Sequence, residues 1–191
     1  MLFDGLTALD LVGFYDAVKR VPRFSGIHVL AHLCAMGDEV RDDHGLVLTA
    51  IRVHPDLSDY DLVFVPGGFA TRQLCHDEDL IAWLGSARKA RYKVSVCTGA
   101  LLLGGAGLLA GKRATTNPNA YDLLAPYCRE VVKARIVPDG DVITAGGVAA
   151  SIDLGLYFAE LLTDSESARS TQRSMDYPYY RPGLVGQDYT I

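Results

Sequence analysis

The sequence predicts a single doubly wound α/β domain, and three observations support this prediction. Apolar segments that fit buried strands alternate along the chain with segments that fit helices, as in a sheet covered by helices on both faces. The apolar run 61–69 ends in Pro-Gly-Gly and does not alternate with polar residues, which is typical of a buried parallel strand. The length of 191 residues suits one compact domain with a sizeable core.

Composition narrows the class of protein further. The net charge of -5 argues against a basic nucleic-acid-binding face. No apolar run approaches the ~20 residues of a membrane span, and no signal peptide opens the chain. The four cysteines are scattered without a Cys-x-x-Cys pair, so we expect reduced thiols and no metal centre. We therefore expect a cytoplasmic protein without a nucleic-acid or membrane partner.

The first half of the chain begins with an apolar stretch, Met1–Gly5, which looks like the tail of a strand entering a turn. Thr7 is placed to cap a helix over 8–21 that has Asp10 in its first turn. Beyond this helix the pattern predicts a strand at 27–34, a short strand or hairpin at 46–51, the strand at 61–69 and a helix at 79–90.

The second half is organised around the stretch 92–103, where a strand pattern passes without a loop into an Ala/Leu/Gly helix pattern that runs to about Leu109. After it we expect a short strand at 111–117, a helix at 121–127, a hairpin of 131–137 with 142–147, and helices at 149–162 and 165–175. The tail 176–191 is rich in tyrosine, and we expect it to lie extended over the surface of a domain that spans 1–191.

Cys97 lies at the joint between the strand and the helix of this central stretch. A residue at such a joint occupies a tight and usually strained turn, the nucleophile elbow. The N–H groups and the dipole of the following helix predict a thiol pKa below the ordinary ~8.5. The alternative is a buried structural cysteine, because cysteine is among the most frequently buried residue types.

Several residues with useful chemistry follow predicted strands and should share one edge of the sheet. A carboxyl group near an anionic sulfur has a raised pKa and can carry a proton, whereas at a helix start it can simply favour the dipole. Glycine turns can direct backbone N–H groups at developing negative charge, or can be ordinary strand–helix turns. The candidates are Asp10 as the acid, Cys97 as the nucleophile with Thr98 beside it, and Gly67, Gly68, Asn117, Gly146 and Gly147 as substrate- or oxyanion-binding residues.

These residues lie in motifs that resemble the ThiJ/PfpI superfamily over nearly the whole chain. The motifs are LFDGLTALDLVGFYDAV at 2–18, DLVFVPGG at 61–68, SVCTGALLLGGAGLLAGKRATT at 95–116 and ITAGGVAASIDLGL at 143–156. The resemblance implies a flavodoxin-like three-layer sandwich with a mostly parallel sheet, as in class I glutamine amidotransferases. It also implies a homodimer.

Within the superfamily, the Cys-Thr-Gly and Leu-Asp-Leu motifs resemble those of the isocyanide hydratase branch. This resemblance implies cofactor-free hydration of an isocyanide to an N-substituted formamide, with Asp10 as the acid and Cys97 as the nucleophile. The hydratases have His-Trp where this chain has Asn117-Pro118, so the pocket wall differs. Two alternatives stay open: a glyoxalase-type carbonyl enzyme that uses the same thiolate, and a non-enzymatic redox sensor based on oxidation of Cys97.

Overall fold

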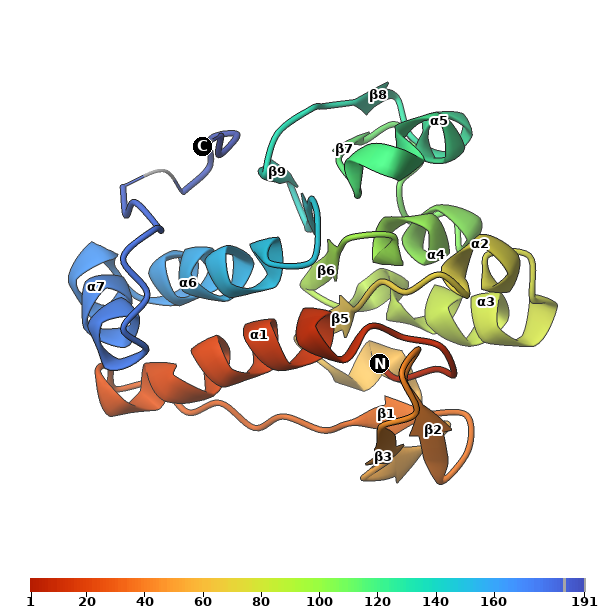
Figure 1. Cartoon of the computed structure of the whole chain (residues 1–191), viewed down its shortest axis with the longest axis horizontal. Helices are drawn as coiled ribbons and strands as arrows, with labels where there is room; N and C mark the ends of the chain where they lie inside the picture. The colour runs from red at the N-terminus through yellow and green to blue at the C-terminus, as the bar shows by residue number, and fades with distance from the viewer. Residues whose placement is uncertain (184, 191) are drawn as a thin grey trace.

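The computed structural model describes residues 1–183 and 185–190 and is built around one mixed sheet (Figure 1). Its strand order is β5-β6-β10-β9, in which β5, β6 and β10 run parallel and β9 pairs antiparallel with β10. The strands are β5 (Leu62–Val65), β6 (Tyr92–Val96), β9 (Ile136–Asp139) and β10 (Val142–Ala145). This arrangement confirms the predicted α/β class with a mostly parallel sheet.

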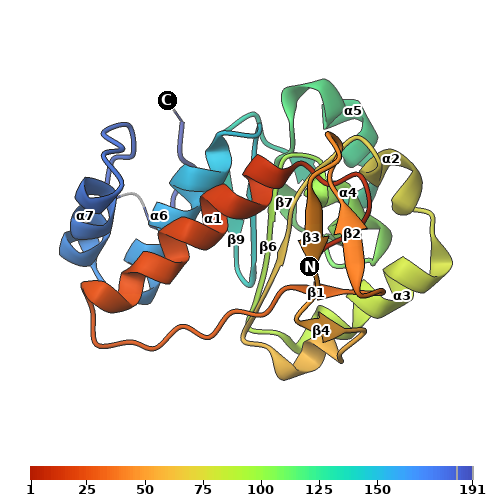
Figure 2. The ribbon, with the colours of Figure 1, turned by 60° about the horizontal axis from the view of Figure 1, so that its bottom comes forward.

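Helices cover both faces of the sheet, which gives three layers (Figures 1 and 2). One outer layer contains α1 (Ala8–Arg20), α6 (Ala150–Leu162) and α7 (Ser165–Ser174). The other contains α2 (Thr71–Leu74), α3 (Glu78–Gly85), α4 (Gly99–Gly105) and α5 (Tyr121–Leu124). In the part of the chain that the structure describes, we find no helix with the length and apolar character needed to span a bilayer.

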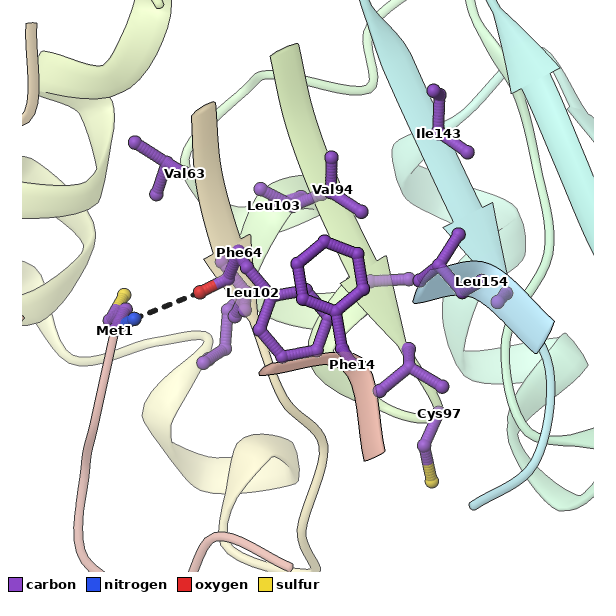
Figure 3. Close-up of a cluster of buried hydrophobic side chains, with 14 of the residues drawn as sticks. Met1, Phe14, Val63, Phe64, Val94, Cys97, Leu102, Leu103, Ile143 and Leu154 are labelled. Carbon is purple, nitrogen blue, oxygen red and sulfur yellow. Dashed lines mark hydrogen bonds between the residues drawn. The ribbon is translucent and has the colours of Figure 1, made fainter. Parts of the chain in front are cut away.

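The core between α1 and the sheet follows from the apolar spacing of α1. Leu11, Phe14 and Val18 recur at helical intervals and are all buried. Phe14 stacks on Phe64 of β5 with ring centroids 4.1 Å apart, and it meets Phe158 of α6 edge-on at 5.9 Å. Figure 3 shows Phe14 and Phe64 stacked among buried apolar side chains between α1 and the sheet.

Shorter elements surround the main sheet. Three two-stranded sheets pair β1 (Cys34–Ala35) with β4 (Arg52–Val53), β2 (Glu39–Arg41) with β3 (Val47–Thr49), and β7 (Arg113–Ala114) with β8 (Glu130–Val131). The antiparallel β2–β3 pair confirms the hairpin expected near 46–51. Single 3₁₀ turns complete the set: η1 (Val21–Arg23), η2 (Leu57–Asp59), η3 (Ser86–Lys89), η4 (Pro118–Ala120) and η5 (Ala125–Tyr127).

Two strand predictions near the N-terminus are wrong. Of the predicted strand 27–34 only Cys34 pairs, because within residues 1–183 no strand lies beside the rest of the segment. Met1–Gly5 forms no strand either, although Met1, Leu2 and Phe3 are buried. Its backbone bonds are scattered over three neighbours: Met1 donates to the Phe64 carbonyl at 2.9 Å, Leu2 to Cys34 at 2.6 Å and Gly5 to Arg41 at 2.7 Å, which does not make a ladder with any one strand.

In the second half, several predicted elements are shorter than expected or divided. The predicted strand 131–137 is split between β8 and β9, which pair with different partners, and 111–117 is a strand only at β7. The helix after Cys97 ends at Gly105 because the chain turns at Gly107, which follows the C-cap Ala106 and has a φ angle of +68°. The predicted helix 79–90 is α-helical in α3 and continues as η3.

The C-terminal tail lies largely on the surface, as expected, but two of its tyrosines are buried. Tyr180 and Tyr189 are buried, and the Tyr180 hydroxyl donates to Glu160 of α6 at 2.8 Å. The Tyr189 N–H donates to the Ile136 carbonyl at 2.9 Å, which adds a bridge at the edge of β9. Two buried tyrosines therefore anchor a tail that otherwise lies on the surface, while positions 184 and 191 of the predicted tail lie outside the described residues.

Candidate active site

Cys97 occupies a left-handed backbone conformation, with φ of +53°, between β6 and α4. Such a conformation is unusual for a residue with a side chain and persists only where neighbouring contacts hold it. The Cys97 N–H donates to the Gly146 carbonyl at 2.6 Å, and its carbonyl accepts from the Thr116 hydroxyl at 2.7 Å. The predicted nucleophile elbow is thus confirmed, and two neighbouring loops hold it in place.

The Cys97 thiol lies at the margin of the apolar core. Figure 3 shows its sulfur directed away from the side chains clustered around Phe14. Only 6% of Cys97 is exposed, and the Asn117 amide nitrogen lies 3.5 Å from the sulfur. A reacting molecule therefore meets a residue that is almost completely buried.

Asp10 lies in the first turn of α1 and is completely buried. Its Oδ2 accepts the Gly67 N–H at 2.8 Å, while its Oδ1 has no hydrogen-bond partner. A Cβ atom on Gly67 would lie 2.7 Å from Asp10 Oδ2 and 2.7 Å from the Cys97 Cβ. Only glycine therefore lets the carboxyl group and the thiol approach the same point.

Burial raises the pKa of Asp10 to about 7, although the Gly67 N–H and the Cys97 thiol both oppose this rise. The nearby Asp43 carboxylate contributes a further, smaller rise in the pKa. The sequence predicted a raised pKa because of an anionic sulfur. The direction is confirmed, but removal from water is its main cause.

The predicted fall in the thiol pKa is wrong, because the pKa of Cys97 is raised. Burial is the largest cause, and the charge of Asp10 adds to it. The Thr98 backbone N–H, the Asn117 amide and the Thr98 hydroxyl act in the opposite direction without prevailing. The helix N-terminus therefore contributes as expected, but desolvation of a buried thiolate outweighs it.

The Thr98 hydroxyl makes hydrogen bonds with both the N–H and the carbonyl of Gly68. The Thr98 hydroxyl donates to the Gly68 carbonyl at 2.9 Å and accepts the Gly68 N–H at 3.1 Å. The Gly67 N–H is likewise engaged, by Asp10. In this structure the two glycines therefore position Thr98 and the acid, and the Thr98 N–H is the backbone donor that faces the thiol.

The other predicted binding residues come to the same edge of the sheet but differ in their roles. Asn117 contacts the sulfur while its Oδ1 caps η4 by accepting the Asn119 N–H at 3.0 Å. The Gly146 carbonyl accepts the Cys97 N–H, and the Gly146 N–H donates to the Arg135 carbonyl at 2.9 Å. Gly146 therefore supports the elbow. A Cβ on Gly147 would lie 3.8 Å from the Asn117 amide, which places Gly147 at the outer rim.

Two neighbours of the site were not among the predicted residues. Thr116 holds the elbow through the Cys97 carbonyl, and its position at the polar end of the predicted strand 111–117 could have suggested it. Asp43 lies in the turn between β2 and β3 and influences Asp10 across the fold. No local sequence pattern indicates that contact, because the two residues meet only through tertiary packing.

The arrangement provides a buried thiol, a buried acid with one unpaired oxygen, and amide and hydroxyl donors around them. In residues 1–183 and 185–190 no histidine hydrogen-bonds to Cys97. Asp10 is therefore the group in this site that can carry a proton to and from the thiol. Two open hollows of about 530 and 540 Å³ lie elsewhere, beside Asp4 and beside Trp83. The chemistry at Cys97, rather than cavity size, identifies the candidate site.

Comparison with known proteins agrees with this fold. Isonitrile hydratase of Pseudomonas putida is 38% identical over 178 residues, covering 93% of this chain and 76% of the relative. A ThiJ/PfpI family protein from Pseudomonas syringae superposes with a TM-score of 0.83 at 31% identity, covering 97% of this chain and 76% of that one. A cysteine-to-alanine mutant of a DJ-1 superfamily protein from Salmonella typhimurium follows at 0.75 and 25%, covering 93% and 96%. The DJ-1/PfpI family model matches residues 1–161, and the chain belongs to this family.

Proposed function

We propose that the protein is a cofactor-free hydratase that converts an isocyanide, R–N≡C, to the N-substituted formamide R–NH–CHO. The observation that carries the proposal is the convergence of the Asp10 carboxyl group and the Cys97 thiol on Gly67, with one carboxyl oxygen left unpaired. The similarity to isonitrile hydratase supports the same reaction class.

In the first step, ionised Asp10 takes the proton of the Cys97 thiol as the sulfur adds to the terminal isocyanide carbon. Asp10 then gives this proton to the same carbon, which yields the thioimidate R–N=CH–S–Cys97 and regenerates the carboxylate. The single proton has moved from sulfur to carbon through one group. The raised pKa of Asp10, about 7, suits a group that must both accept and donate near neutral pH.

In the second step, Asp10 removes a proton from water as the oxygen adds to the thioimidate carbon, and it passes that proton to the nitrogen. The tetrahedral species R–NH–CH(OH)–S–Cys97 then collapses. The carbonyl forms, the hydroxyl proton goes to Asp10, and the sulfur leaves as a thiolate that recovers its proton. Water thus supplies the oxygen and both hydrogens that the product gains.

The burial of Cys97 supports an isocyanide over a bulky electrophile. An isocyanide carbon is terminal and the R–N≡C unit is linear, so it can reach a sulfur in a residue of 6% exposure end-on. The Thr98 N–H and the Asn117 amide next to the sulfur would orient the adduct. A peptide bond or a branched carbonyl would need a more exposed sulfur.

The test is steady-state production of formamide from a simple alkyl isocyanide, with wild type and Cys97→Ala assayed side by side. We expect turnover by wild type and none by Cys97→Ala, because no other thiol lies at the elbow. If wild type produces no formamide, or if Cys97→Ala retains the wild-type rate, the proposed function is wrong.

The two alternatives give different results in companion assays. A glyoxalase-type enzyme would form lactate from methylglyoxal through Cys97. A redox sensor would accumulate stoichiometric oxidation of Cys97 at low peroxide with no turnover of any electrophile. The burial and raised pKa of Cys97 weigh against the sensor, because an exposed thiolate is the form that peroxide oxidises readily.

We further propose a homodimer, in which a second copy covers the exposed side of α1. Leu9, Val12 and Tyr15 recur every three residues on this helix and are 49%, 48% and 39% exposed. Sedimentation equilibrium should give twice the chain mass for wild type and a lower mass for Val12→Glu. A wild-type monomer at micromolar concentration would contradict the proposal.

A further inference from the structure

The turn between β2 and β3 is fastened to the segment that leads into α1 (Figure 2). The Asp43 N–H donates to the Leu6 carbonyl at 2.9 Å, and the Thr7 hydroxyl donates to Asp43 Oδ2 at 3.0 Å. On its other side, the Thr7 N–H donates to the Gly67 carbonyl at 2.8 Å. Thr7 therefore lies between Asp43 and the glycine that contacts Asp10.

Thr7 has the N-cap position of α1, but its side chain makes no capping hydrogen bond. A threonine at this position ordinarily accepts a backbone N–H from the first turn. Here the hydroxyl donates to Asp43 instead, while the Thr7 carbonyl accepts the Asp10 N–H at 3.1 Å. Two hydrogen bonds thus connect Asp43 to the backbone of Asp10.

Asp43 also contacts the adjacent histidine. Its Oδ1 lies 2.6 Å from His44 Nδ1, and the His44 side chain is 84% exposed. The sequence of contacts therefore runs from solvent at His44, through Asp43 and Thr7, to the backbone N–H of Asp10, a residue that is completely buried. The reaction scheme above uses neither Asp43 nor His44.

We propose that Asp43 and His44 form a positioning couple that adjusts the pH at which Asp10 gives up its proton. Asp43 places a negative charge beside the N-terminus of α1 and fixes Thr7. His44 cancels part of that charge when it is protonated. The inference rests on the proposed function in one respect, namely that Asp10 is the proton carrier.

The signs of these effects follow from the charges that face each group. Asp10 faces Asp43, Cys97 and the Gly67 N–H, and the charge of Asp43 raises its pKa. His44 faces Asp43 and Asp42, and contact with Asp43 raises the histidine pKa above 6.5. Protonated His44 offsets part of the Asp43 charge, so the loss of His44 should leave Asp43 less compensated.

The experiment is a carbon-13 NMR titration of the Asp10 carboxyl group in the full-length protein labelled at aspartate carboxyl carbons. Asp10→Asn identifies the signal. Asp43→Asn should lower the titration midpoint by roughly half a pH unit, about threefold in the dissociation constant, because a like charge has been removed. His44→Gln should raise the midpoint by a smaller amount, and the double variant should match Asp43→Asn.

The control is Asp38→Asn, which makes the same change of charge at an exposed residue of the preceding turn, outside the contacts described above. It should leave the midpoint unchanged. Midpoint shifts of the same sign in Asp43→Asn and His44→Gln, or no shift in Asp43→Asn, would overturn the proposal. The titration observes Asp10 directly, so its result is independent of isocyanide turnover, and the two proposals can fail separately.

Discussion

The two ends of β6 hold buried ionisable groups in opposite ways. At the start of the strand, Lys93 is buried and fully engaged. Its ammonium group donates to Asp141 and, at 3.0 Å, to the Ala90 carbonyl, while Asp141 also binds Lys112 at 2.8 Å. Just past the other end, Asp10 has one carboxyl oxygen without a partner.

This difference separates a structural charge pair from a reactive one. Lysine neighbours lower the pKa of Asp141 to about 2, so its charge is stabilised in the folded protein. Burial raises the pKa of Asp10 to about 7, so its charge is opposed. A group that the fold leaves unsatisfied can exchange its proton with a neighbour, whereas a group held by several partners cannot do so without loss of stability.

The largest expected effect of breaking the reactive end is on turnover by Asp10→Asn. The amide can still accept the Gly67 N–H, but it cannot carry a proton between sulfur, water and the bound carbon. We expect formamide production to fall by about a thousandfold, within the range for loss of a general acid or base. Steady-state kinetics measures this, and an Asp10→Asn rate within tenfold of wild type would contradict the assigned role.

The same variant should gain stability at alkaline pH. Because the folded-state pKa of Asp10 is raised to about 7, its contribution to the free energy of unfolding is greatest below pH 4, near the unfolded pKa. It declines as the pH rises to about 7 and stays low above that. Asp10→Asn should therefore exceed wild type by roughly 3 kcal/mol at alkaline pH and match it near pH 4. Urea unfolding at both pH values measures the difference, and equal stability at alkaline pH would count against a buried, strained acid.

The opposite end of β6 should respond to Asp141→Asn with a loss of stability and no change in the rate per folded molecule. Buried Lys93 would lose its main counterion, which we expect to cost about 2 kcal/mol after allowance for the partial exposure of Asp141. Because the folded-state pKa of Asp141 is lowered, its contribution is present above pH 4 and disappears as the pH falls through about 2.

Lys93→Met provides the matched variant at this end. It removes the buried charge together with its need for a partner, so it should restore most of the loss when combined with Asp141→Asn. Urea unfolding at neutral pH compares the three proteins. A double variant as unstable as Asp141→Asn alone would show that Lys93 is not the group left unpaired.

The smallest expected effect belongs to Asn117→Ala. The Asn117 amide lies 3.5 Å from the sulfur and lowers the thiol pKa against the stronger effect of burial. Its loss should raise the thiol pKa and slow alkylation of Cys97 by iodoacetamide about threefold at a fixed pH below the midpoint. Asn119→Ala, two residues along the same turn, is the control and should alkylate at the wild-type rate.

Much of the fold could be predicted from sequence because strand and helix patterns alternate and end at recognisable turns. The convergence of Asp10, Gly67 and Cys97 was expected for the same reason, since carboxyl ends of parallel strands meet at one edge. The strand prediction for 27–34 is wrong although the alternating pattern of this segment fits a strand. Strand formation also depends on a neighbouring strand, which the local sequence does not reveal.

Two features of the site depend on tertiary packing and could not be predicted from local patterns. The Thr98 N–H at the start of α4 does stabilise a thiolate at Cys97, as the strand–helix joint predicts. The local pattern does not weigh this effect against burial and the charge of Asp10, which together raise the thiol pKa. The contact of Asp43 with Thr7 spans 36 residues and depends on how the hairpin docks against α1.

The most direct test of the account asks whether sulfur or carboxyl oxygen holds the proton at neutral pH. The ultraviolet absorbance of the thiolate, measured as a wild-type minus Cys97→Ala difference across pH, reports the ionisation of Cys97. We predict that the thiolate signal has its midpoint above the ordinary pKa of a free thiol, and that the signal appears at lower pH in Asp10→Asn. A full thiolate signal near pH 6 in wild type would contradict the account, because the elbow would then hold a stable thiolate that does not need Asp10 as its base.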